Sequence, residues 1–133
     1  MNLKALSLAA LAAFALAVPA SAHHSFAMFD AEKTVTLTGT VKEFEWTNPH
    51  AWLRIMVQDQ TAGKPVQWAL EMGSPGQQAG RGWKPDSVKP GDKVTITLHP
   101  LKDGSRGGQL LTAALPNGQQ LTNGGQRNNP LGE

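Results

Sequence analysis

The stretch TVTLTGTVKEFEW, residues 34–46, decides the fold. Val35, Leu37, Gly39 and Val41 share one face and alternate with threonines, and the apolar alternation then shifts by one residue to Phe44 and Trp46. Alternation with period two is typical of an antiparallel strand. A bulge near Lys42-Glu43 explains the shift, and it would bend one long strand so that the strand serves both halves of a small barrel.

The same alternation recurs further along the chain. It runs through residues 51–58, 66–72, 94–98 and 110–115, with turn residues between these segments. Between the second and third of them, Ser74-Pro75-Gly76-Gln77 has the serine, proline and glutamine that open a short helix. The sequence therefore predicts an all-β fold with one short helix, in the order β-β-β-α-β-β. This order, with a bent first strand, is that of a small five-stranded OB-like barrel.

The first 22 residues have the features of a secretory leader. Lys4 gives a basic start, the apolar stretch 5–18 is too short to span a bilayer, and Ala20-Ser21-Ala22 forms a cleavage motif. We expect a signal peptide cleaved after Ala22 and a periplasmic product, with cleavage after Ala20 as the alternative. The remaining chain divides into an N-terminal arm (23–33), a barrel domain (34–121) and a disordered tail (122–133) rich in Gly, Asn and Gln.

Composition excludes several functions. The chain has 12 basic and 10 acidic residues, and its lysines alternate with acidic residues, so nucleic acid is not an expected partner. No membrane span is expected after cleavage. Because there is no cysteine, disulfides are excluded, and a metal could be bound only by histidine, carboxylate, methionine or the terminal amine.

The four histidines are the candidate metal ligands. Cleavage after Ala22 would make His23 the first residue, with its amine and imidazole forming a chelating pair. His24 offers an alternative, since a histidine in second position can bind Cu(II) through the amine, the intervening amide and its own ring. His50 and His99 border the loops that flank the ligand-binding face of OB barrels, and strand alternation turns both away from the core.

The first functional hypothesis is a periplasmic copper carrier or buffer. Cu(II) favours nitrogen ligands in a tetragonal array, and His23 with one or both of His50 and His99 would form a histidine-brace type site. Met28 could add a sulfur ligand for Cu(I), although filling a gap is its more common role. We expect Phe26 and Phe29 to dock the arm on the barrel. The competing interpretation is a solvated terminal histidine pair with two ordinary surface histidines.

The second hypothesis is a metal-independent binding module for a small ligand, saccharide or partner protein. Trp52 is its candidate ligand-face residue, because it faces away from the core while the other three tryptophans are expected to pack in the core or at its rim. A copper oxidase or oxygenase is a minor third possibility. No catalytic residue is assigned, since Ser-His-Asp order and paired carboxylates are lacking, and Glu71 is expected at the surface or in a turn.

Distinctive motifs indicate a family. They include His23-His24-Ser25-Phe26, Asn48-Pro49-His50-Ala51 and Pro90-Gly91-Asp92. In these motifs, over about residues 22–121, the chain resembles a bacterial exported family filed as domain-of-unknown-function family 6152. The resemblance implies export and includes both the first histidine and that of Asn-Pro-His in the family pattern, but it implies no activity. Where such proteins usually carry helical leucines, this chain has Gln77-Gln78-Ala79-Gly80, so we expect a shorter and more weakly docked helix.

Overall fold

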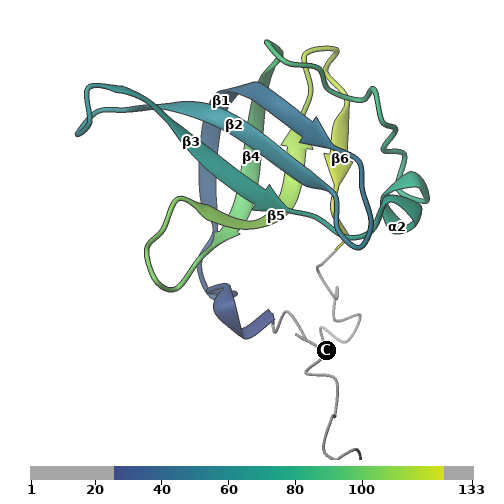
Figure 1. Cartoon of the computed structure of the whole chain (residues 1–133), viewed down its shortest axis with the longest axis horizontal. Coiled ribbons are helices and arrows are strands. Elements are labelled where there is room, and N and C mark those ends of the chain that lie inside the picture. Colours follow the sequence, from purple (N-terminus) through teal and green to yellow (C-terminus); the bar gives the residue numbers. More distant parts are fainter. Residues whose placement is uncertain (1–25, 125–133) are drawn as a thin grey trace, which may run out of the picture.

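The computed structural model describes residues 26–124 (Figure 1). Within them the chain forms a 3₁₀ turn, one α-helix and six strands. In chain order these are η1 (Phe26–Met28), β1 (Val35–Glu45), β2 (Trp52–Asp59), β3 (Lys64–Glu71), α2 (Pro75–Ala79), β4 (Lys93–Pro100), β5 (Gly107–Ala114) and β6 (Gln120–Thr122).

The strands close into the predicted OB-like barrel. Hydrogen-bonded neighbours follow the order β3-β2-β1-β4-β5-β6, and these neighbours are antiparallel. A short parallel pairing of β3 with β5, from Ala69 opposite Gly107 to Glu71 opposite Gln109, joins the two ends of the five-stranded barrel. The element order β-β-β-α-β-β is therefore confirmed, and β6 is an additional short strand on β5 that the sequence pattern did not predict.

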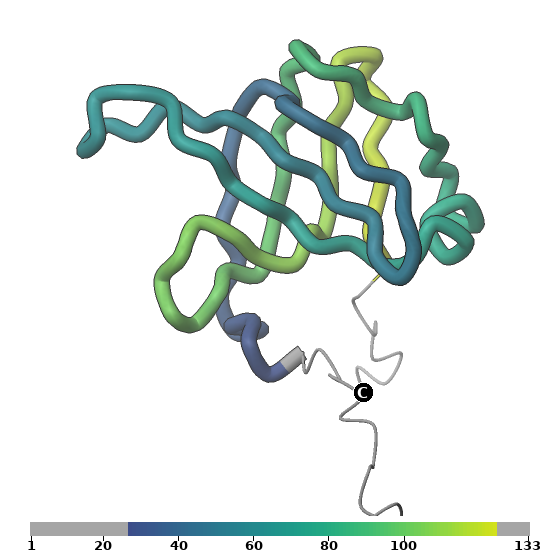
Figure 2. The backbone as a smooth tube through the Cα atoms, viewed as in Figure 1, coloured from purple at the N-terminus to yellow at the C-terminus, as the bar shows by residue number. Residues whose placement is uncertain are grey.

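Strand β1 bends as predicted. Its first half pairs with β4 and its second half with β2, and the register shifts between Val41 and Glu43 where the bulge was expected. Figure 2 shows the tube rising from η1 through the first half of β1 and then turning across the barrel. Gly39 allows this close crossing, because a Cβ there would lie 2.6 Å from the backbone oxygen of Met56.

Two glycines allow the barrel to close. A Cβ on Gly107 would lie 3.0 Å from the backbone oxygen of Ala69, and one on Gly108 would overlap the backbone oxygen of His99. A side chain at either position would push β5 away from its neighbours. The two glycines that begin β5 are thus part of the closure of the barrel.

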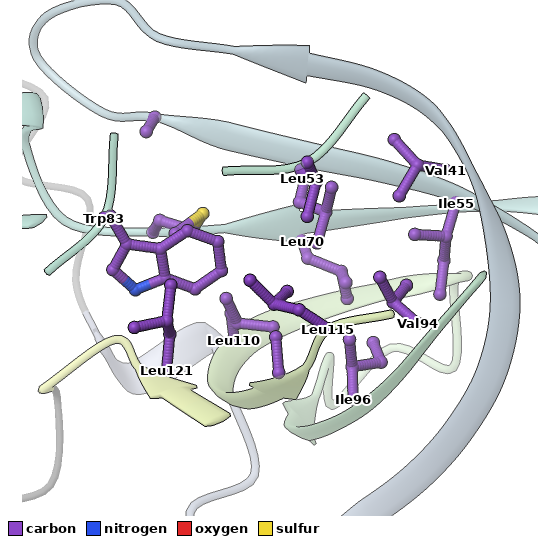
Figure 3. Packing of buried hydrophobic residues seen from close by; sticks show 14 of the residues in the cluster. Val41, Leu53, Ile55, Leu70, Trp83, Val94, Ile96, Leu110, Leu115 and Leu121 are labelled. Carbon is purple, nitrogen blue, oxygen red and sulfur yellow. The ribbon is translucent and has the colours of Figure 1, made fainter. Parts of the chain in front are cut away.

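The core fills the barrel with the residues that alternation placed inward (Figure 3). Each strand from β1 to β5 contributes fully or almost fully buried side chains, among them Val41, Leu53, Ile55, Leu70, Val94, Ile96, Leu98 and Leu110. Trp83 lies among them near Leu121, is 1% exposed, and donates its indole N–H to the Thr122 carbonyl at 3.0 Å. Burial of each such large apolar side chain contributes roughly 1.5–3 kcal/mol, so this alternation dominates the stability of the fold.

Helix α2 has the predicted start and an unexpected anchor. Ser74 and Gln77 form a capping box, with each side chain accepting a hydrogen bond from the other residue's backbone N–H. The helix has only five residues, as expected from its sequence. It is anchored by Gln78, which is fully buried and donates its side-chain N–H to Oδ1 of Asn123 at 2.7 Å.

The folded chain extends further than the predicted boundary at residue 121. Thr122 lies in β6, and Asn123 is buried and hydrogen-bonded to the body of the domain. Its Oδ1 accepts from the backbone N–H of Gly73 at 2.9 Å, and its Nδ2 donates to the carbonyl of Leu110 at 2.7 Å. The ordered part of the domain therefore includes residues 122 and 123, which the sequence analysis assigned to the tail. Residues 125–133 of that tail lie outside the described part of the chain.

The predicted leader, residues 1–22, and the histidines His23 and His24 also lie outside the described residues. Among residues 26–124, no helix has the length and apolar character needed to cross a membrane.

Candidate functional site on the outer face of the barrel

His50 lies directly before β2, at the turn that follows β1, and it contacts the end of β3. Its Nδ1 lies 2.9 Å from the carbonyl oxygen of Met72 and 3.5 Å from Oε1 of Glu71. The His50 side chain is 33% exposed and that of Glu71 is 10% exposed. The histidine of Asn-Pro-His is therefore held against a buried carboxylate.

The hydrogen bond to Met72 fixes which ring nitrogen of His50 carries the proton. A carbonyl oxygen can only accept, so Nδ1 donates to it, and Nε2 then carries the lone pair in the neutral ring. A backbone carbonyl on one ring nitrogen is the usual way in which a metal-binding imidazole is oriented. The geometry therefore presents the His50 Nε2 as a nitrogen ligand.

His99 has the same arrangement at a different place. Its Nδ1 donates to the carbonyl oxygen of Lys33 at 2.7 Å, which likewise leaves the lone pair of the neutral ring on Nε2. In the strand ladder His99 lies opposite Gln109, and Gln109 lies opposite Glu71. His99 and the His50–Glu71 pair are thus on the same face of the barrel, with β5 between them.

These groups do not form a complete metal site by themselves. Among residues 26–124, no cluster of three or more His, Cys, Asp or Glu side chains could hold a metal ion. A site that uses His50 or His99 needs further ligands, and the predicted ones on His23 and His24 lie outside the described residues.

Glu71 is a residue whose role the sequence reasoning missed. It was expected at the surface or in a turn, but only 8% of it is exposed. Alternation does place it on the outer face, opposite Trp52 in the ladder. Glu71 lies opposite Gln109 of the neighbouring strand β5 and lines the same cleft as Met28 and Phe29 of the arm, and alternation within one strand cannot reveal either neighbour. One signal in the sequence could have pointed to Glu71. The predicted hairpin of the second and third strands places Glu71 next to Trp52, the residue expected on the ligand-binding face.

The N-terminal arm is docked on this outer face. Phe29 is 7% exposed and forms a β-bridge with Leu101. The Lys102 N–H donates to the Met28 carbonyl at 3.0 Å, and the Asp30 N–H donates to the Pro100 carbonyl at 2.8 Å. Figure 1 shows η1 beside the loop between β4 and β5. The predicted docking through Phe29 is confirmed.

A cleft of about 170 Å³ lies between the arm and the barrel. Met28, Phe29 and Leu101 line it on the arm side, and Trp52, Ala69 and Glu71 line it on the sheet side. Arg106 and the two closure glycines complete it. Trp52, predicted to point outward, therefore lies in the wall of a cleft. The cleft is on the face of β2 and β3 and beside the loop between β4 and β5, which is where OB barrels bind their ligands.

The two arginines near the cleft have carboxylate partners. Arg54 lies 6.0 Å from the ring of Trp52, and its Nη1 contacts Glu43 at 3.2 Å and Glu45 at 2.5 Å. Arg106 contacts Asp59 at 3.1 Å and so links the loop before β5 to the β2–β3 hairpin.

The pKa of Asp59 is lowered by its surroundings. The hydrogen bond from the backbone N–H of Ala62 is the largest cause. Burial is the next-largest effect and raises the pKa, but the Arg106 side chain and the N–H of Thr61 also lower it, and the net direction is downward. The partners of Asp59 therefore stabilise its charged form.

Comparison with known proteins identifies the family but no characterised relative. No curated protein matches the chain. No solved structure matches it either. The model of a family of unknown function, DUF6152, matches residues 10–111, which is most of the chain and includes the strands of the barrel up to the middle of β5. The chain therefore belongs to the DUF6152 family of unknown function.

Proposed function

We propose that this protein is an exported, periplasmic copper-binding protein with a carrier or buffer role. Its Cu(II) ligands are the terminal amine and imidazole of His23, exposed by cleavage after Ala22, together with Nε2 of His50. Three nitrogens of this kind suit the tetragonal coordination that Cu(II) prefers.

The single observation that supports this proposal is where the arm docks. Met28 lines the same cleft as Glu71, and the Glu71 carboxylate lies 3.5 Å from the His50 ring. Phe26, two positions before Met28, follows His23 by three positions along the chain, a span of at most about 11 Å. The docked arm therefore lies at the cleft that Glu71, the neighbour of His50, also lines, and this placement favours His50 as the ligand that the residues before the arm would meet.

Two contacts of His50 suit the role of ligand. The Met72 carbonyl accepts the Nδ1 proton, and the Glu71 carboxylate lies beside the same nitrogen. Such outer partners orient a metal-binding imidazole and raise its basicity. His99 has a carbonyl partner but lies beyond β5, next to Lys33 rather than next to the start of the arm. We therefore assign the third nitrogen to His50.

The test is a Cu(II) titration of the chain that begins at His23, with intact mass confirming that first residue. His24→Ala removes the alternative in which the amine, the next amide and the His24 ring bind the ion. In that background we expect His50→Gln to weaken Cu(II) binding by roughly one to two orders of magnitude, as expected for loss of a ligand or its orienting contact.

His99→Gln in the same background is the matched control and should leave the affinity unchanged. Loss of Cu(II) binding on His24→Ala alone would show that the site is formed by the first two residues without the barrel. Equal affinities for the His50→Gln and His99→Gln chains would equally contradict the proposal.

A further inference from the structure

We infer that the cleft beneath the N-terminal arm binds a small organic ammonium compound, with Glu71 as its counter-ion and Trp52 as its aromatic wall. This inference does not depend on the copper proposal, because the metal is assigned to the Nε2 side of His50 and Glu71 lies on its Nδ1 side.

The first argument is the state of Glu71. Its side chain is only 10% exposed, yet its single ion-pair partner among the described residues is His50, at 3.5 Å. That distance is longer than a normal hydrogen bond, and the same nitrogen already donates to Met72 at 2.9 Å. A buried carboxylate without a close cation is costly, so a cationic ligand in the cleft would be favoured.

The second argument is the charge balance around the cleft. Arg106 is paired with Asp59, and Arg54 is paired with both Glu43 and Glu45. Neither arginine forms an ion pair with Glu71. Both arginines are paired with other carboxylates, so Glu71 is the charged lining residue without an arginine or lysine partner among the described residues. An anionic ligand would meet Glu71 directly and is disfavoured.

The third argument is the chemistry of the walls. Met28, Phe29 and Leu101 are apolar, and Trp52 offers an aromatic surface. Aromatic rings attract cations at their faces, and apolar walls favour a hydrocarbon body next to the charged group. A bare inorganic cation has no hydrocarbon part that could pack against these apolar side chains.

The fourth argument is size. A volume of about 170 Å³ is smaller than the roughly 300–1,000 Å³ of pockets for drug-sized ligands. The cleft therefore fits one small amine and not a saccharide chain or a nucleic acid strand. The ammonium would donate hydrogen bonds to Glu71 while its apolar part lies between Trp52 and Met28.

The experiment uses the chain from residue 23 to 133 with a chelator present, so that metal binding does not contribute. Benzylamine is the probe, and benzyl alcohol is the uncharged ligand of the same shape. Binding is followed by NMR at the Trp52 indole N–H and the Met28 methyl group. We expect both signals to shift with benzylamine and the alcohol to bind at least roughly tenfold more weakly, as loss of a charged hydrogen bond implies.

Glu71→Gln should weaken benzylamine binding by a similar factor. Glu43→Gln is the matched control on the same face, where Arg54 keeps Glu45 as its partner, and it should leave binding unchanged. The comparison of the two ligands on the unaltered chain gives an answer even if Glu71→Gln does not fold. Equal binding of the amine and the alcohol, binding unaffected by Glu71→Gln, or absence of binding by benzylamine would overturn the inference.

Discussion

At the scale of single residues, Asn123 connects more of the molecule than any pattern in its segment suggests. Its side chain accepts hydrogen bonds from the Gly73 N–H and the Gln78 amide and donates one to the Leu110 carbonyl. It therefore joins the start of α2, the helix itself and β5. It begins a segment rich in Gly, Asn and Gln, a composition that indicates a tail, so its burial could not be predicted from composition.

Asn123→Ala should lower the free energy of unfolding by about 3 kcal/mol, because it leaves buried polar groups of three segments without their partner. Urea unfolding of the two proteins measures this difference. The matched control is Thr122→Ala, an exposed neighbour whose backbone carbonyl still accepts the Trp83 indole N–H, and its effect should stay within about 0.5 kcal/mol. Equal effects of the two substitutions would show that the Asn123 network does not anchor the helix.

At the scale of elements, the sequence predicts those features that depend on local patterns. The bulge in β1 follows from the shift in alternation after Val41, and the start of α2 follows from Ser74 and Gln77. Strand β6 has three residues, too few for alternation to show. The contact between the β2–β3 hairpin and the loop before β5 depends on tertiary packing, and only the structure reveals it.

The hydrogen bonds of Asp59, chiefly the one from the backbone N–H of Ala62, should make the stability of the fold depend on pH. The hydrogen bonds of Ala62, Arg106 and Thr61 lower the pKa of Asp59 below its usual value of 3.8. A carboxylate with a lowered pKa in the folded state contributes stability above its unfolded pKa, and this contribution is lost as pH falls through the folded pKa.

The Asp59→Asn chain should therefore lose less stability than the native chain when the pH falls from roughly 5 into the range below the lowered pKa. Thermal unfolding at a series of pH values measures the two losses, and NMR of the Asp59 carboxyl carbon measures its pKa directly. Parallel stability curves for the two chains, or an Asp59 pKa at or above 3.8, would contradict the assignment.

At the scale of the whole molecule, the OB-like barrel follows from the order and spacing of the strands, while the candidate site follows only in part. Trp52 lines the cleft on the outer face, where alternation along β2 placed it. The surroundings of Glu71 include the parallel pairing of β3 with β5 and the cleft that the docked arm also lines. The surroundings of Glu71 are determined by contacts between segments that are distant in sequence, and the local periodicity of one strand does not predict such contacts.

The central claim is that the start of the exported chain and the barrel share one copper ion. Pulsed electron paramagnetic resonance of bound Cu(II) tests it most directly, because it distinguishes one coordinated imidazole from two. In the His24→Ala chain beginning at His23, the account predicts two imidazoles, and one after His50→Gln is added. A spectrum that His50→Gln leaves unchanged would contradict it, since the barrel would then contribute no ligand.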